Sequence, residues 1–413
     1  MKIITDLHIH SRFSRACSPK INVENLDLWA KIKGINVLGT GDFTHPEWLK
    51  ELKTNLEPAE TGLFCFKKST TGVRFLLTSE ISCIYSKGGK VRKVHIVVFA
   101  PSFEAVDEIN SELDKIGNLK SDGRPILGLD VKELARIVLT ADKDCLIVPA
   151  HIWTPWFALF GSKSGFNSIE ECFEDYAKHI YAVETGLSSS PSMNWQLSSL
   201  DNIALISNSD AHSASKIGRE ANVFDTELSY HGIIDAIKSN DPKKFLYTIE
   251  FFPEEGKYHY DGHRSCDICF DPQQSLRSGG ICPVCGKALT IGVLSRVQEL
   301  ADRPLGSKGK IPFKSIIPLE EIISECVGIG PKSKKVQSLY DNMIKGLKNE
   351  FYILIEASRK EIEEVCDANI AEGIIRVREG KVNIKPGHDG VFGRIEIFSE
   401  TDLKKRISQS MLF

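Results

Sequence analysis

Two histidines close to the start of the chain, His8 and His10, constrain its fold more than any other feature. They follow an apolar segment containing Ile3 and Ile4, which predicts a short buried strand with the histidines at its carboxyl end. Side chains two positions apart on a strand project from the same face, so both imidazoles can reach one metal ion. For this motif alone, a solvated pair of histidines is the alternative.

Acidic residues and histidines recur at the ends of later apolar segments in the first 250 residues. Each could be structural by itself, because a strand-end acid can cap a helix and a buried histidine can satisfy its own nitrogens. Together they favour a barrel of β/α units, in which the carboxyl ends of the strands meet at one rim. The strand-end residues are Asp42, Glu80, His151, Glu184, Asp210 and His212, and His95 lies within a β-branched segment.

Helical patterns separate these segments, at residues 23–32, 103–116 and 131–139, and Gly34 is a stop signal for the first. Strands that alternate with helices predict parallel βαβ units and therefore an α/β fold. About seven strand-like segments precede residue 250, which favours a closed barrel over an open sheet. A dinucleotide-binding fold is disfavoured, because no GxGxxG motif follows the first strand.

Residues 1–250 resemble the PHP (polymerase and histidinol phosphatase) family, whose fold is a distorted seven-stranded β/α barrel with two or three metal ions. The resemblance lies in His8-x-His10, Thr40-Gly41-Asp42, Glu80, His95, His151 and Asp210-x-His212. It implies one metal held by His8, His10, Glu80 and Asp210, a second bridged by Glu80 and held by His95 and His151, and a third site to which Asp42 and His212 contribute.

The chain departs from that family at two positions of the third site. Asp42 stands where a histidine is usual, and Arg15 stands where an acid or a histidine often lies. The arginine could instead bind a phosphate, with a solvated loop arginine as the alternative. We expect Asp210, His212 and Arg15 to take part in catalysis.

The expected ligands indicate the chemistry of the barrel. Mixed imidazole and carboxylate ligands suit Zn, Mn or Fe, whereas carboxylates alone would favour Mg. Two or three such divalent metals can activate a water and clamp both oxygens of an in-line phosphoryl displacement. The sequence therefore predicts phosphoester hydrolysis, and no Ser-His-Asp arrangement or P-loop competes with it.

A second metal motif follows the barrel. Two C-x2-C pairs, Cys266/Cys269 and Cys282/Cys285, are separated by twelve residues and predict one structural zinc ion held by four thiolates. A redox or disulfide pair is the alternative, but it fits poorly with a chain in which we find no signal peptide. With four thiolates closing the tetrahedron, we expect the nearby His263 to be a surface or nucleic-acid contact.

Residues 291–405 have helical patterns, and the turn Gly328-Ile329-Gly330 precedes Lys332, Lys334 and Lys335. This turn resembles a helix-hairpin-helix loop, whose backbone N–H groups can hold a DNA phosphate; a plain interhelical turn is the alternative. We therefore expect a barrel at 1–250, a zinc module at 251–290, a DNA-binding helical domain at 291–405 and a flexible tail at 406–413.

This order of parts resembles the endonuclease Q family over essentially the whole chain. Segments 149–166, 184–188 and 207–212 carry the resemblance most strongly. It implies a metal-dependent DNA repair endonuclease that incises 5′ of uracil, hypoxanthine, xanthine and abasic sites. In the loop after His151, we expect Trp153, Trp156 and Phe157 to stack on bases and Lys163 to contact a phosphate, although aromatic residues also serve as core and a loop lysine can be merely solvated.

The end of the chain, Gln409-Ser410-Met411-Leu412-Phe413, resembles the QxxLF motif that docks bacterial proteins on the replication sliding clamp. Gln409 offers hydrogen bonds, and Leu412 and Phe413 can fill an apolar pocket; folding back onto the chain's own domain is the alternative. No window has the ~20 apolar residues needed to cross a bilayer, so we expect no membrane association and a cytoplasmic, nucleoid-associated protein.

Two other functions stay open on sequence alone. A small-molecule phosphoesterase of the histidinol-phosphatase kind would explain the metal ligands, but it would leave the zinc module and the tail without a role. A non-catalytic DNA-binding protein is disfavoured by the nearly complete ligand set. The net charge of −3 is unusual for a DNA-binding protein, yet local lysine clusters remain and predict salt-dependent binding.

Overall fold

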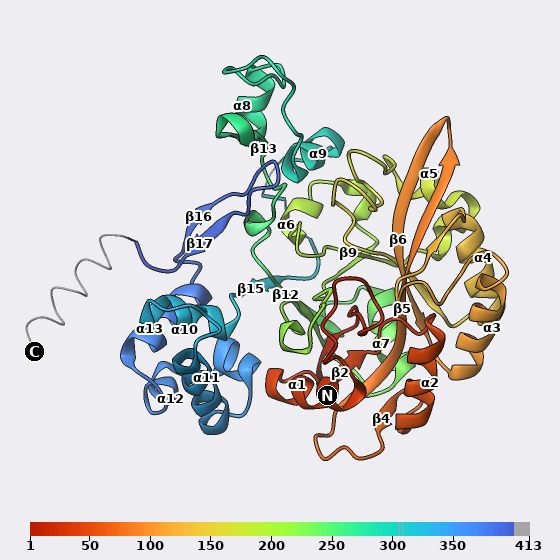
Figure 1. Cartoon of the computed structure of the whole chain (residues 1–413), viewed down its shortest axis with the longest axis horizontal. Coiled ribbons are helices and arrows are strands. Elements are labelled where there is room, and N and C mark those ends of the chain that lie inside the picture. The colour runs from red at the N-terminus through yellow and green to blue at the C-terminus, as the bar shows by residue number, and fades with distance from the viewer. Residues whose placement is uncertain (305, 308, 400–413) are drawn as a thin grey trace, which may run out of the picture.

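Strands whose apolar side chains are mostly buried build the barrel that carries the predicted ligands (Figure 1). The computed structural model describes residues 1–304, 306–307 and 309–399. Around the barrel follow β1 (Lys2–Asp6), β2 (Val37–Gly39), β5 (Arg74–Lys87), β6 (Lys90–Ala100), β8 (Leu146–Pro149), β9 (Ala182–Glu184) and β10 (Ala204–Ile206).

The strands close into a distorted ring. The parallel pairs are β1 with β2, β2 with β5, and β9 with β10. The amide of Ile152 donates to the carbonyl of Glu184, which links β8 to β9, and a parallel bridge between Ile9 and Ala211 links β10 back to β1. The predicted distorted β/α barrel is therefore confirmed.

One strand breaks the expected parallel alternation. β5 and β6 form a long antiparallel hairpin joined by Gly88-Gly89, and β6 also runs antiparallel to β8. No helix separates the two strands, so the prediction of uniform βαβ units is wrong here. The hairpin stands out from the barrel in Figure 1, and His95 lies within β6 where that strand enters the barrel rather than at a strand end.

Helices cover the outside of the barrel, and their ends follow the expected signals. The first begins at Asn22, whose side chain accepts from the amide of Asn25, and ends at Gly34 in the left-handed region with φ 90°. The barrel helices are α1 (Val23–Lys33), α2 (Pro46–Asn55), α3 (Phe103–Leu113), α4 (Val131–Ala141), α5 (Ile169–Phe173), α6 (Pro191–Asn194) and α7 (Tyr230–Ser239).

Further strands extend the barrel sheet on both sides. β11 (Ala221–Asp225) runs antiparallel to β1, and β12 (Phe245–Glu250) runs antiparallel to β11. β15 (Phe313–Ser315) pairs with β12, so the chain returns to the barrel after the zinc module. Three short strands flank the other side: β3 (Leu56–Pro58), β4 (Phe64–Phe66) and β7 (Ile126–Leu127).

The small module at the top of Figure 1 contains β13 (Asp261–His263), β14 (Ile268–Phe270), α8 (Pro272–Arg277) and α9 (Val293–Leu300). A hairpin from the end of the described chain, β16 (Asn383–Lys385) and β17 (Arg394–Glu396), joins it. The tip of that hairpin lies against the module, since the backbone amide of Tyr260 donates to the carbonyl of Gly387 at 2.9 Å.

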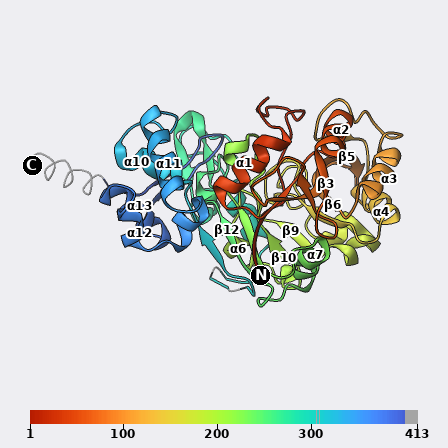
Figure 2. The ribbon, with the colours of Figure 1, turned by 90° about the horizontal axis from the view of Figure 1, so that it is seen from below.

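A helical unit lies beside the barrel in both views (Figures 1 and 2). It consists of α10 (Leu319–Val327), α11 (Lys334–Gly346), a π-helical turn (Tyr352–Glu356), α12 (Arg359–Glu363) and α13 (Ala368–Arg378). A buried ion pair joins it to α1, with Lys33 Nζ 2.6 Å from Glu350 Oε2. Among the described residues, no helix is both long and apolar enough to cross a membrane.

Candidate metal centre

The first group of metal ligands gathers at the rim of the barrel. His8 and His10 follow β1, Glu80 lies on β5, and Asp210 follows β10. Their ligand atoms all lie within 4.8 Å of one another. His10 Nε2 is 3.0 Å from Asp210 Oδ1 and 3.2 Å from Glu80 Oε2. Four donors that are distant in sequence are thus placed around one point.

The residues of this group fit a divalent metal. His8 Nε2, His10 Nε2 and Asp210 Oδ1 are buried and have no hydrogen-bond partner among the described residues. Such unpartnered buried atoms are costly in a folded protein unless a ligand satisfies them. Imidazole nitrogens and carboxylate oxygens that converge in this way are the donor set of Zn, Mn or Fe.

A second group shares Glu80 with the first. Glu80 Oε1 lies 2.7 Å from His95 Nδ1 and 3.0 Å from His151 Nε2, and the two imidazole nitrogens are 3.2 Å apart. The other oxygen of Glu80 faces the first group. In this geometry the two groups share Glu80, as the PHP resemblance implied.

Buried carboxylates behind the ligands orient two of the imidazoles. Glu184 accepts from His8 Nδ1, from the amide of His151 and from the side chain of Asn208. Because Nδ1 is engaged, the other ring nitrogen of His8 faces the ligand group, as is usual for metal-binding histidines. The role of Glu184 could have been suspected from its strand-end position.

Asp42 has the same orienting role, which corrects its predicted place in a third metal site. Its oxygens accept from His10 Nδ1 at 2.9 Å, from the amide of Ser11 at 2.6 Å and from the hydroxyl of Ser14 at 2.8 Å. It is fully buried and is not among the clustered ligands. Its oxygens are thus committed to hydrogen bonds that fix His10.

Of the other residues of the expected third site, His212 lies beside the first ligand group but is not among the clustered ligands. His212 donates from Nδ1 to the carbonyl of Asp210, and its ring lies 4.7 Å from that of His10. Arg15 is exposed, and it is not among the clustered ligands. The cation at the rim is instead Arg124, whose Nη1 is 2.9 Å from Glu80 Oε2. A lone arginine in a loop far from Glu80 in sequence carries no signal that would have identified it.

The electrostatics of the rim keep its acids ionised. Burial alone would raise the pKa of Glu80, but neighbouring His95 and Arg124 hold it well below its usual value. Burial opposes protonation of His8, yet the carboxylates of Glu184 and Glu80 raise its pKa well above 6.5. Burial lowers the pKa of His95 to about 4. The acids of the rim thus stay ionised, which is the form in which a carboxylate binds a cation.

The zinc module has a different ligand set from the one predicted. His263, Cys266, Cys282 and Cys285 have ligand atoms within 4.8 Å of one another. Cys269 is outside this cluster, and its thiol lies 3.9 Å from the carbonyl of Pro386. The physical reason is the antiparallel pairing of β13 with β14, which sets Cys269 opposite Gly262. The spacing His263-x2-Cys266, identical to that of Cys282-x2-Cys285, was the missed signal.

The aromatic loop after His151 divides into buried and exposed parts. Trp153 is buried and donates from Nε1 to Asn194 Oδ1 at 2.7 Å, so it is a core residue and its predicted stacking on DNA is wrong. Trp156 is 42% exposed, with its ring 5.8 Å from that of Tyr258. Phe157 is partly buried against His95, and Lys163 is exposed.

A pocket of about 290 Å³ opens directly beside the ligands. His151 and Asp210 of the barrel line it, as do Tyr258 and His259 from the segment before β13. The remaining lining residues are Thr154, Pro155, Gly186, Leu187, Ser188, Pro253, Gly256, Lys257 and Val293. The pocket is therefore shared between the barrel rim and the segment that leads into the zinc module.

The predicted turn of the helical unit is present between α10 and α11. Gly328 ends α10 in the left-handed region with φ 69°, and the side chain of Ser333 caps α11 by accepting from the amide of Val336. Lys332, Lys334 and Lys335 are exposed around the start of α11. The predicted clamp-binding residues Gln409, Leu412 and Phe413 lie outside the described residues.

The chain is similar to known proteins in one domain and over nearly its whole length. Residues 318–381 match the family model of the MJ0043 C-terminal domain. The chain is 30% identical to the uncharacterised protein YqxK of Bacillus subtilis (strain 168), over 96% of this chain and 99% of the relative.

Two crystal structures superpose closely on this one. The lesion-specific endonuclease PfuEndoQ from Pyrococcus furiosus has a TM-score of 0.85 and 32% identity, with 98% of this chain and 99% of that chain covered. Endonuclease Q in complex with a 27-mer duplex substrate, with an abasic lesion at the active site, has a TM-score of 0.85 and 33% identity, with 98% of each chain covered. At this identity and coverage, the chain belongs to the endonuclease Q family.

Proposed function

We propose that this protein is a metal-dependent endodeoxyribonuclease that cuts damaged DNA at abasic sites and on the 5′ side of uracil, hypoxanthine and xanthine. The observation that carries the proposal is the pair of ligand groups that share Glu80 beside a pocket lined by His151 and Asp210. The related endonuclease Q structure with an abasic lesion at its active site supports it.

The pocket limits which DNA can reach the ligands. Ligand pockets usually measure roughly 300–1,000 Å³, so about 290 Å³ suits one nucleotide and not a duplex. The target nucleotide therefore has to leave the helix, which costs least where the base is damaged or mispaired. Ser188 and His259 line the pocket and carry side-chain atoms without a hydrogen-bond partner among the described residues, so they are candidates to read the base.

The residues at the rim would have three roles: holding metal, contacting a phosphate and orienting the metal ligands. His8, His10, Glu80 and Asp210 would hold one divalent metal, and Glu80, His95 and His151 a second. Such metals supply Lewis-acid activation of water and of the phosphodiester. Arg124, which is partly exposed beside Glu80, supplies the nearest fixed positive charge for a phosphate. Glu184 and Asp42 keep the two imidazoles in their binding orientation.

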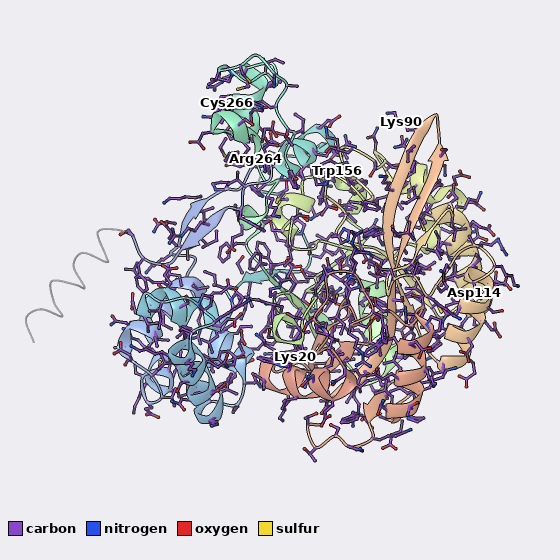
Figure 3. All side chains as sticks on the ribbon, in the orientation of Figure 1. Lys20, Lys90, Asp114, Trp156, Arg264 and Cys266 are labelled. Carbon is purple, nitrogen blue, oxygen red and sulfur yellow. The ribbon has the colours of Figure 1, made fainter. Side chains whose placement is uncertain are left out.

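Contacts with DNA outside the pocket form a second part of the proposal. Lys332, Lys334 and Lys335 surround the first turn of α11, where backbone N–H groups and lysines can hold a phosphate together. Trp156 and Lys163 extend from the loop beside the pocket, and Figure 3 shows Trp156 in the interval between the β5–β6 hairpin and the zinc module. The cluster of His263 with three cysteines would hold a zinc ion that stabilises this module.

We also propose, from sequence alone, that Gln409, Leu412 and Phe413 dock on the replication sliding clamp. Deletion of the last five residues should abolish retention on immobilised clamp, while cleavage of a short oligonucleotide should be unchanged. Retention of the shortened chain at the wild-type level would contradict this part without affecting the nuclease proposal.

The nuclease proposal is tested with labelled duplexes that carry one uracil, hypoxanthine, xanthine or abasic site at a known position. With Mn²⁺ or Mg²⁺ we expect a single cut on the 5′ side of the lesion, and none in the undamaged duplex or with a chelator. The Asp210→Asn variant should be inactive, and Glu227→Gln, an exposed substitution far from the rim, serves as the matched control. Hydrolysis of small phosphomonoesters without DNA cleavage would favour a small-molecule phosphoesterase instead.

A further inference from the structure

An exposed aromatic ring lies at the tip of the β16–β17 hairpin. Phe392 is 69% exposed, and no sequence motif connects its segment with the metal centre. The tip is held firmly, because Gly390 donates to the carbonyl of Lys257 at 2.9 Å and Gly393 donates to that of Glu255 at 3.0 Å. A Cβ at Gly393 would meet the carbonyl oxygen of Glu254 at 2.0 Å, so only glycine permits this close approach.

Phe392 is connected to the pocket beside the metal ligands through a single residue. The Lys257 ammonium lies 4.4 Å from the centre of the Phe392 ring, and Lys257 also lines the pocket. Lys257 thus lies between the exposed ring and the pocket that His151 and Asp210 help to form. The ring is therefore close to the pocket opening but remains outside it.

A second exposed aromatic ring also contacts a residue that lines the pocket. Trp156 follows Pro155, which lines the pocket, and its ring meets that of Tyr258, another lining residue. Two exposed rings from separate parts of the chain, Phe392 and Trp156, therefore contact neighbouring lining residues of one pocket, Lys257 and Tyr258. Single exposed apolar side chains are common on protein surfaces, so the place of these two rings beside the pocket indicates a role and their exposure alone does not.

We propose that Phe392 enters the base stack of the DNA and fills the gap that the extruded nucleotide leaves, with Lys257 beside it to meet a phosphate of the same strand. This inference rests on the proposed nuclease function. An extruded nucleotide leaves two base faces without a neighbour, and proteins that extrude or kink DNA insert apolar side chains into such gaps. Trp156 stacks on a second base near the pocket.

The exposed ring has no comparable structural role. With 69% of its surface in contact with solvent, Phe392 contributes little to the packing of the hairpin, whose tip is fixed by backbone hydrogen bonds. Leu276 on α8 is 83% exposed and is not among the residues that line the pocket. Both side chains are thus mostly exposed, but only Phe392 contacts a residue that lines the pocket, Lys257.

The test compares Phe392→Ala, Phe392→Trp and the control Leu276→Ala on two substrates. One is a duplex with a paired uracil, and the other carries the same uracil in a short mismatched bubble, where no continuous stack has to be replaced. For the duplex we expect Phe392→Ala to lower kcat/KM about 5- to 150-fold, which corresponds to ~1–3 kcal/mol of base–aromatic stacking. Cleavage in the bubble should change little, Phe392→Trp should restore duplex cleavage, and Leu276→Ala should behave as wild type.

A fluorescent base analogue next to the uracil gives a second readout, because its emission rises when it loses its stacked neighbour. With wild type the rise on binding should be small, since the ring replaces the lost base, and with Phe392→Ala it should be large. Equal losses on duplex and bubble, or duplex cleavage by Phe392→Ala at the wild-type rate, would overturn the inference. Failure of the wild type to cut either substrate would instead refute the nuclease function itself.

Discussion

The contacts of Glu184 allow one substitution to be worked out in detail. Oε1 accepts from Asn208 Nδ2 at 2.9 Å, Oε2 accepts from the amide of His151 at 2.9 Å, and both oxygens lie 3.0 Å from His8 Nδ1. In Glu184→Gln one of the two oxygens becomes an NH2 group. In either orientation that group faces a donor, from Asn208 or from His151, so one hydrogen bond is lost and one buried donor is left unpaired.

The size of the expected loss in metal affinity follows from these contacts. A hydrogen bond to a charged group contributes ~1.5–3 kcal/mol, and His8 also loses the carboxylate that fixes its orientation. We expect the affinity for divalent metal at the first ligand group to fall roughly 10- to 100-fold, in line with the usual effect of such supporting residues. The global fold should persist, since the side chain keeps its size.

The assay is calorimetric titration of the metal-free protein with Mn²⁺, together with the Mn²⁺ dependence of cleavage. Glu227→Gln, an exposed substitution of the same chemistry, is the control. We expect the variant to recover most of its cleavage at high Mn²⁺, because the metal ligands themselves remain. A metal affinity of Glu184→Gln equal to that of wild type would refute the argument that this carboxylate supports His8.

Three further outcomes are expected. His263→Ala should release zinc from the purified protein, whereas Cys269→Ala should keep it, as measured by metal analysis; the opposite pattern would restore the four-cysteine site. Burial raises the pKa of Glu250 to about 8, so the folded protein keeps a proton that the unfolded chain loses above its ordinary pKa near 4.5. The contribution of Glu250 to stability is therefore fullest below about pH 4.5 and falls by ~1.4 kcal/mol per pH unit towards about pH 8. In thermal unfolding, Glu250→Gln should lose less stability than wild type over this range; parallel profiles would contradict the reasoning. Trp153→Ala should destabilise the fold by ~3–5 kcal/mol, because the ring is buried. Trp156→Ala should leave the melting temperature nearly unchanged and weaken the binding of lesion-containing duplex. A large loss of stability in Trp156→Ala and none in Trp153→Ala would show that the exposed ring is the structural one.

Much of the barrel could be predicted because its signals are local. Helices begin and end where caps and apolar spacing place them, as at α1 with Asn22 and Gly34. The β5–β6 hairpin was missed because an apolar run has no direction, and only the absence of a helix between Lys87 and Lys90 distinguishes an antiparallel return from a parallel crossover. The hairpin nevertheless brings His95 to Glu80, since Glu80 pairs with Val97 two residues further along β6.

The sequence by itself determined the kinds of donor at the rim, because metal binding needs imidazoles and carboxylates and strand alternation puts His8 and His10 on one face. Only the tertiary structure decided which donors face the centre. Asp42 turns to support His10, and His263 takes the place of Cys269. The physical reason is that spacing along the chain fixes residue type and periodicity, whereas coordination depends on the direction and distance of single atoms, which the pairing of distant strands sets.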